Sequence, residues 1–272
     1  MQRRFRFRYA CIGLFAVGAQ FLGFDGVGAA LAAPEPAKSA AATTGYDVSF
    51  PQCTARLPSR PGFAIVGVND GRAFTANPCL ASEYAWATTS TATNEPHVSF
   101  YANTGNPGPV AAPTHWPPAG TKTPRACDGS WSESCAYDYG WNAAQDSFQD
   151  ATAAHVVQPA DAPWWLDVET ANSWSNDTGT NRATLQGAIV ALKAAGVGSI
   201  GIYSTASMWS EITGAVSPDS PFNNPFRALP NWVPGARSAK DAPNLCSRTF
   251  TGGPVKFVQY PTSGLDGDYA CM

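Results

Sequence analysis

The sequence is short of the groups that serve most metal-binding and nucleophilic chemistry. It has three histidines, His97, His115 and His155, without metal-ligand spacing, and no C-x-x-C pair. We therefore expect no zinc site, and no metal or other cofactor. There is no G-x-S-x-G elbow, and no G-x-G-x-x-G or Walker loop follows any predicted strand. Serine hydrolases and nucleotide-binding enzymes consequently lack support.

Basic residues are also few. The chain has 272 residues, with 17 Lys or Arg against 20 Asp or Glu. Four of the arginines and one aspartate lie in residues 1–32, so their removal would leave 13 basic and 19 acidic residues and a formal charge near −6. No basic cluster survives in the remainder, and we therefore exclude nucleic acid as a partner.

Long hydrophobic runs are missing except at the N-terminus. Residues 1–32 have a basic start, an apolar middle and the small-residue exit Ala30-Leu31-Ala32. This pattern predicts a secretory signal peptide. A permanent membrane helix is the weaker alternative, because Gln20 and Asp25 interrupt the apolar run. No later apolar segment could span a bilayer. We expect a secreted monomer, free or associated with a cell wall, without a membrane anchor after cleavage.

Cysteine, in contrast, is plentiful. Seven are present, and six remain if Cys11 leaves with the signal peptide. An even number in an exported protein predicts disulfides, and six cysteines allow fifteen pairings that sequence alone does not distinguish. Each bond would stabilise the fold by roughly 2–4 kcal/mol. Proximity along the chain favours three pairs: Cys53–Cys79, Cys127–Cys135 and Cys246–Cys271.

The chain after the signal peptide divides into a linker and one domain. Residues 33–44, rich in Pro, Ala and Thr, predict a linker, and residues 45–272 predict the domain. Strand-length apolar runs there alternate with helical patterns, which predicts a mostly parallel sheet. At about 240 residues, an α/β fold of the (β/α) TIM-like barrel type fits best, and a doubly wound open sheet is second. We expect strands over 45–50, 63–68, 97–102, 163–169, 199–203, 231–233 and 254–260, and helices over 78–88, 137–155, 181–195 and 205–212.

Between the third strand and the second helix, residues 103–135 form a long segment rich in Gly, Pro and Thr. A connection of that length in a compact domain is usually functional or disordered. The pair of cysteines near its end, Cys127 and Cys135, favours an ordered loop.

The stretch that organises the domain is PWWLDVET, residues 163–170. Residues two apart on a strand point to the same face, so Trp165, Asp167 and Glu169 should share one side. A carboxylate removed from water needs partners, which makes two of them at the end of an apolar strand a costly arrangement. The alternative is a structural role, in which both acids form salt bridges at the strand end. Few basic residues lie nearby in sequence to form them.

Other acids are expected at the same rim of the barrel. In a parallel barrel the chemistry lies at the carboxyl ends of the strands. Asp47 lies on the first strand, and Asp266 and Asp268 lie just beyond the last one, which neighbours the first in a closed barrel. Taken singly, these residues could be ordinary strand-end or turn aspartates. Together with Asp167 and Glu169 they predict one acidic pocket, which suits glycoside hydrolysis with Glu169 as the acid.

Aromatic residues near the predicted strand ends could stack on sugar rings, although core packing explains any single one of them as well. They are Trp174, Tyr203, Trp232 and Tyr260.

Six segments in order, GYDVSFPQ, FAIVGVNDG, WLDVE, GIYS, NWVPGA and FVQY…LDGD, resemble the family 25 glycoside hydrolases. That resemblance covers about residues 45–272. It implies a barrel modified in its C-terminal strands and activity on peptidoglycan-type polysaccharide at N-acetylmuramic acid. The chain is similar to a secreted bacterial subgroup with extra cysteines, as in FPQC and LDGDYAC, that is described only as glycoside-hydrolase-like.

The resemblance also implies residue roles. The first-strand aspartate of the family matches Asp47, its D-x-E pair matches Asp167 and Glu169, with Glu169 the proton donor, and its C-terminal acid matches Asp266. Asp268 stands where the family has an asparagine. The end of the family's last strand matches the pair Gln259-Tyr260, and we expect these two residues and Asp268 to bind substrate.

Three features depart from the family pattern. Cys53 stands in place of a glycine after the first strand, and Asn69-Asp70-Gly71 stands in place of a T-E-G glutamate. The segment 103–135 is also longer than the family predicts. Together with the acidic charge, these departures keep a second hypothesis open, a non-catalytic glycan-binding or cell-wall-binding protein on the same barrel. A hydrolase of another exported polysaccharide is the third.

Overall fold

The computed structural model describes residues 44–93, 95–108, 114–122, 126–214 and 225–271. The predicted signal peptide, 1–32, lies outside the described residues. So does the predicted linker, 33–44, except for Thr44, which begins the first strand. In the part of the chain that the structure describes, no helix combines the length and apolarity needed to cross a bilayer.

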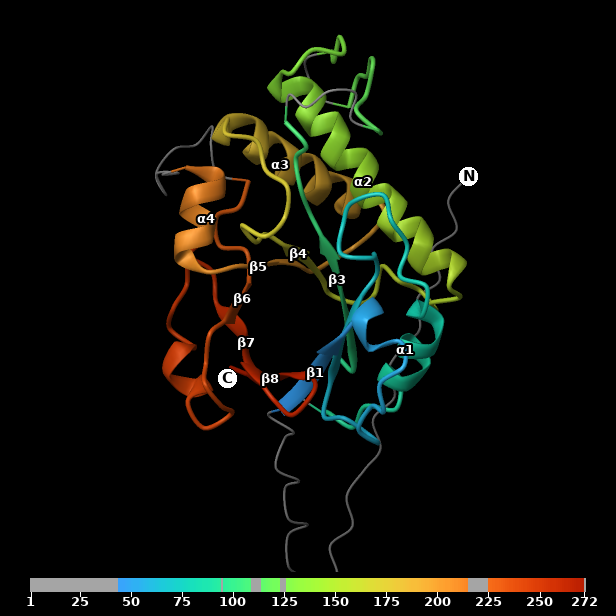
Figure 1. Cartoon of the computed structure of the whole chain (residues 1–272), viewed down its shortest axis with the longest axis vertical. Coiled ribbons are helices and arrows are strands. Elements are labelled where there is room, and N and C mark those ends of the chain that lie inside the picture. Colours follow the sequence, from blue (N-terminus) through green and yellow to red (C-terminus); the bar gives the residue numbers. More distant parts are fainter. Residues whose placement is uncertain (1–43, 94, 109–113, 123–125, 215–224, 272) are drawn as a thin grey trace, which may run out of the picture. The chain divides into compact units, whose positions relative to one another are not determined.

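Eight strands close into a barrel in chain order (Figure 1). The predicted barrel is confirmed and the open sheet is excluded. The strands are β1 (Thr44–Val48), β2 (Ala64–Gly67), β3 (Val98–Asn103), β4 (Trp164–Asp167), β5 (Ile200–Tyr203), β6 (Asn231–Pro234), β7 (Val255–Pro261) and β8 (Asp266–Ala270).

Helices follow most of the parallel strands and cover the outside of the barrel (Figure 1). Each lies within a few residues of its predicted range, and two short 3₁₀ turns complete the connections. The helical elements are η1 (Phe50–Gln52), α1 (Leu80–Ala87), α2 (Glu133–Ala153), α3 (Thr178–Ala194), α4 (Ala206–Thr213) and η2 (Ala242–Leu245).

The barrel is irregular at its C-terminal end. Neighbouring strands from β1 to β7 pair in parallel, but β8 is antiparallel to both β7 and β1. The sequence analysis ended the sheet at residue 260 and placed Asp266-Gly267-Asp268 just beyond the last strand. Instead these residues pair with β1 in the register Asp47↔Asp266 and Gly45↔Asp268. A hairpin with β7 therefore replaces the last helical crossover.

The pleat of β4 separates two apolar layers, as its alternation predicts. Trp164 and Leu166 point outward and belong to the large core beneath the helices. Trp165 points inward and packs with Trp232 and Phe257 inside the barrel, at ring-centroid distances of 6.1 and 5.4 Å. The barrel interior below the rim is therefore filled with aromatic side chains.

Glycines allow the two longest helices, α2 and α3, to pack closely. A Cβ atom on Gly140 would lie 1.9 Å from the carbonyl oxygen of Thr184, and one on Gly187 would lie 2.0 Å from that of Tyr137. Real Cβ atoms do not approach backbone this closely, so the crossing depends on both glycines.

Three disulfides form, and the pairing favoured from sequence is confirmed: Cys53–Cys79, Cys127–Cys135 and Cys246–Cys271. The first joins the end of η1 to the start of α1, the second closes the loop before α2, and the third ties η2 to the end of β8. Three such bonds are typical of proteins that fold in an oxidising compartment.

Candidate active site

The predicted acids meet at one rim of the barrel. Asp47 and Asp167 lie on or at the ends of parallel strands β1 and β4, and Glu169 follows β4 by two residues. Because β8 runs the opposite way, it is its first residue, Asp266, that reaches the same rim, directly across from Asp47. These four acids line one cavity of about 240 Å³.

Among the residues that the structure describes, no basic side chain lines this cavity. Its remaining walls come from η1, from β3, β5, β6 and β7, and from the turn after β2. They are Phe50, Pro51, Gln52, Gly71, Tyr101, Asn103, Tyr203, Trp232 and Gln259. A cluster of carboxyl groups without a counter-charge resists full ionisation, because each negative charge raises the pKa of the others.

Asp47 is held by a chain of hydrogen bonds across the barrel. Its Oδ2 accepts from Gln259 Nε2 at 3.0 Å, and Gln259 Oε1 accepts from the Tyr203 hydroxyl at 2.7 Å. Burial, opposed by the Gln259 hydrogen bond and reinforced by the charge of Asp266, raises the pKa of Asp47 to about 7. Asp47 is therefore partly protonated near neutral pH.

Beneath Asp47 lies Asp268, which is fully buried. Its Oδ1 accepts from Trp232 Nε1 at 2.7 Å, while its Oδ2 has no N–H donor in the described residues. The Asp47 and Asp268 carboxyl groups contact each other through a hydrogen bond. Burial and the Asp47 charge raise the pKa of Asp268 well above its usual range, so Asp268 holds the proton and donates it to Asp47.

Asp167 is fixed by the asparagine at the end of the adjacent strand. Asn103 Nδ2 donates to Asp167 Oδ2, and the Asn103 backbone N–H donates to Asn69 Oδ1 at 3.1 Å. Asn69 Nδ2 in turn donates to the Asn103 carbonyl oxygen at 3.0 Å. Burial and the charge of Glu169 raise the pKa of Asp167 well above its usual range.

Glu169 occupies the outer part of the cavity, half-buried. Burial and the charge of Asp266 raise its pKa. Its backbone is anchored from the loop that follows, because Trp174 Nε1 donates to the Glu169 carbonyl oxygen at 2.8 Å. An accessible carboxyl group with an anchored backbone and a raised pKa is suited to deliver a proton to a bound ligand.

The structure divides the residues predicted to bind substrate. Tyr203, Trp232 and Gln259 line the cavity with the acids. Trp174 and Tyr260 do not: the first packs against the outer core, and the second packs in a separate cluster beside η2. Asp268, also among the predicted binding residues, contacts the site through Asp47 and Trp232.

Six residues that line the cavity were not predicted as site residues, namely Phe50, Pro51, Gln52, Gly71, Tyr101 and Asn103. The last two lie on β3 with their side chains facing inward, in the register Tyr101↔Trp165 and Asn103↔Asp167. Asn103 could have been found from its position opposite Asp167 on the adjacent strand. That position follows only from the register between β3 and β4, which the sequence does not give.

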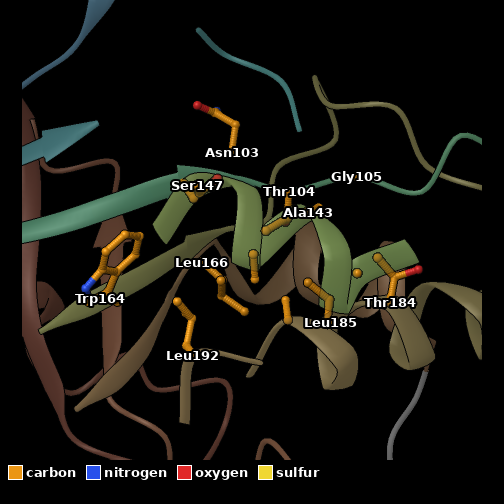
Figure 2. Close-up of a pocket in the computed structure, with 14 residues that line it drawn as sticks. Asn103, Thr104, Gly105, Ala143, Ser147, Trp164, Leu166, Thr184, Leu185 and Leu192 are labelled. Carbon is orange, nitrogen blue, oxygen red and sulfur yellow. The ribbon is translucent and has the colours of Figure 1, made fainter. Parts of the chain in front are cut away.

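A small gap lies outside the barrel, between β3, β4 and the helices α2 and α3 (Figure 2). It has about 20 Å³ of space, which is room for one water molecule. Apolar side chains such as Trp164, Leu166 and Leu185 dominate its walls. We interpret it as a packing gap at the helix crossing.

Among the described residues, one group has its potential metal-ligand atoms close together, Cys53, Cys79 and Glu83. Its two sulfur atoms are joined in a disulfide, which leaves Glu83 as a single ligand. These residues do not fit a metal ion.

Comparison with known proteins identifies the architecture. A muramidase from Acremonium alcalophilum superposes with a TM-score of 0.52 at 15% identity, covering 84% of this chain and 93% of that one. GHIP, a glycosyl hydrolase 25 of Streptococcus pneumoniae, gives 0.50 at 17% identity, covering 83% of this chain and 86% of the other. The fold is that of the family 25 glycoside hydrolases.

The autolysin LytC of Streptococcus pneumoniae, solved with a synthetic peptidoglycan ligand, gives a TM-score of 0.51 at 14% identity. The match covers 83% of this chain but only 46% of that modular protein. Residues 147–222 match the family model described as Lysozyme-like protein 1. No curated protein sequence matches the chain.

Proposed function

We propose that the protein is a secreted glycoside hydrolase that cleaves a peptidoglycan-type polysaccharide at N-acetylmuramic acid. The observation that carries this proposal is the convergence of four carboxyl groups in one cavity at the carboxyl rim of the barrel, where no basic residue of the described ranges lines the walls. The predicted signal peptide and the three disulfides support export. The shared fold supports the substrate class.

In the proposed mechanism Glu169 is the general acid. Burial and the charge of Asp266 raise its pKa, which favours the protonated form, and its half-exposed place in the cavity suits transfer to the leaving glycosidic oxygen. Asp47, Asp167 and Asp266 stabilise the positive charge that develops on the sugar ring. A cation among them favours their ionised forms, so the cluster binds the transition state more tightly than the neutral substrate.

Replacing Glu169 by Gln tests the mechanism. We expect wild-type protein to clear suspensions of purified cell walls and release reducing ends, and Glu169→Gln to lose most of this activity, because the proton donor is absent. General acid catalysis typically contributes about 10²–10⁴-fold. The matched control is Glu211→Gln, the same change at an exposed residue of α4. Equal rates for wild type and Glu169→Gln would exclude the hydrolase mechanism.

Non-catalytic binding to glycan is the second candidate function. The observation in its favour is the turn after β2, where Asp70 stands in place of the family's glutamate and, in the described part of the chain, is not among the residues that line the acidic cavity. Sedimentation of the protein with purified walls, combined with product analysis by mass spectrometry, separates the two functions. Binding without any cleaved product favours the second candidate, and products that lack muramic acid indicate another polysaccharide.

A further inference from the structure

The acidic cavity does not end at the barrel rim. It adjoins a second cavity of about 520 Å³, and Gly71 lines both. Asn106 lines this second cavity and also a third, of about 120 Å³. The three cavities thus follow one another from the acids outward over the loops above β3.

Aromatic side chains connect the second cavity with the third. The Phe74 ring stacks on His115 at 4.3 Å with an interplanar angle of 5°, and it meets Tyr139 edge-on at 5.2 Å. Tyr139 contacts Trp116 at 5.6 Å, and Trp116 contacts Trp131 at 4.2 Å. We call these five residues the aromatic groove.

The aromatic groove has features that core packing does not explain. Trp131 is 40% exposed although it is a large apolar side chain. Trp116 Nε1 has no acceptor in the described part of the chain. Phe74 and His115, the stacked pair, have φ angles of 60° and 71°, in the left-handed region that non-glycine residues rarely adopt. Such conformations persist where the surrounding structure fixes them, commonly at ligand-binding sites.

Three of the five groove residues come from the segment 103–135, which exceeds the family pattern. The chain leaving β3 runs toward the N-terminal end of α2 (Figure 1). In the described part of the segment, the Cys127–Cys135 disulfide and the paired backbones of Gly120 and Cys127 tie residues near Trp116 and Trp131 together. Such ties restrain the aromatic rings before any ligand arrives.

The chemistry of the walls suits a carbohydrate. Aromatic faces pack against the C–H faces of pyranose rings, and hydroxyl and amide groups bind their hydroxyls. Within the described part of the chain, Arg72 is the one Lys or Arg side chain lining the second cavity. The other polar side chains there, His115 and Tyr139 aside, are hydroxyls and amides, namely Thr75, Thr104, Asn106, Thr114, Asn172 and Ser173.

We propose that the aromatic groove binds further sugar residues of the polysaccharide chain whose scissile bond lies among the acids. The position of that bond rests on the proposed function, whereas glycan binding by the groove does not. The protein would therefore prefer long glycan chains to short ones, and the loop 103–135 would set that preference.

Trp131→Ala removes the exposed end of the groove and leaves the acids intact. With peptide-free glycan strands from bacterial walls, we expect KM for long strands to rise about tenfold with kcat unchanged. For the shortest cleavable oligosaccharide we expect no change. Trp131→Phe keeps an aromatic face and should retain most of the affinity. Val157→Ala, a loss of exposed apolar surface elsewhere, is the control. Circular dichroism verifies the folding of each variant.

Binding of the same long strands, followed by tryptophan fluorescence in the Glu169→Gln background, gives a readout that is independent of cleavage. Weaker binding by the Trp131→Ala variant in that background supports the groove even if wild type cleaves nothing, an outcome that refutes only the proposed function. Equal binding with and without Trp131→Ala overturns the groove even if wild type cleaves. Equal losses on long and short strands, or no binding by wild type, also overturn it.

Discussion

At the scale of single residues, the pair Asp47 and Asp268 shows how a buried acid can serve as a neutral donor. Asp268 accepts from Trp232 on one oxygen, and its carboxyl group shares a hydrogen bond with Asp47. An ionised Asp268 would place two negative charges in contact without water, which the low local polarity disfavours. The resemblance to family 25 implies an asparagine here, and a protonated aspartic acid offers the same donor and acceptor pattern.

Asp268→Asn should therefore preserve hydrolysis within a few-fold, because the amide accepts from Trp232 and donates to Asp47. Asp268→Leu should lose most activity and about 1–3 kcal/mol of stability, since it leaves the Trp232 N–H without an acceptor. Wall-clearing rates and urea denaturation of both variants measure this. A loss of activity in Asp268→Asn as complete as in Glu169→Gln would show that an ionised Asp268 is required.

At the scale of elements, the sequence predicted the strands and helices whose hydrophobic pattern lies within their own residues. The apolar runs of β2, β4 and β5 and the amphipathic stripe of α3 lie where expected, because each buries a face that its own residues define. β8 was missed because Asp-Gly-Asp has low strand propensity and reads as a turn. Its strand conformation depends on pairing with β1 and β7, which are more than 200 and about 10 residues away in sequence.

The acids of the site could be predicted because the carboxyl ends of parallel strands share a rim, so Asp47, Asp167 and Glu169 needed only the fold class. The aromatic residues could not be assigned in the same way. Trp174 lies close to Glu169 in sequence, but its loop directs the ring onto the core and the indole N–H onto the backbone. The distance along the sequence between two residues does not determine where a side chain in a loop points.

The crossing of α2 and α3 gives a test at this scale. Alanine is the better helix former, so Gly187→Ala would stabilise an isolated helix by about 1 kcal/mol. Here we expect destabilisation by roughly 1–3 kcal/mol, because the added methyl group meets the carbonyl oxygen of Tyr137. Gly198→Ala is the control, since a Cβ there meets nothing within 4 Å. The urea concentrations at the midpoint of unfolding of wild type and both variants measure this difference. Equal midpoints for wild type and Gly187→Ala would argue against close helix packing.

At the scale of the whole molecule, the buried acids should set the pH dependence of stability. The pKa of Asp47 rises from 3.8 to about 7 on folding, and burial raises that of Glu83 from 4.5 to about 7. Between pH 4 and 7 the folded state therefore keeps protons that the unfolded chain has released. Raising the pH through this window favours unfolding.

We therefore expect the melting temperature to fall from about pH 5 to about pH 8 at constant ionic strength, measured by differential scanning calorimetry. Asp47→Asn should flatten the slope, because it removes one of the titrating groups, whereas Asp161→Asn, at an exposed site, should leave the slope unchanged. A melting temperature that rises across this range would show that these carboxyl groups are ionised in the folded protein.

The reversed direction of β8 has a consequence for how the barrel can be tethered. Because β8 runs back along β1, its last residues pair with the beginning of that strand, with Thr44 opposite Tyr269. The two ends of the barrel thus emerge side by side on the face away from the carboxylates. A tag, a support or a partner domain fused at either end would leave the mouth of the cleft pointing outward and unobstructed. For the same reason, a short peptide joining these ends would allow the chain to be circularly permuted without approaching the cleft.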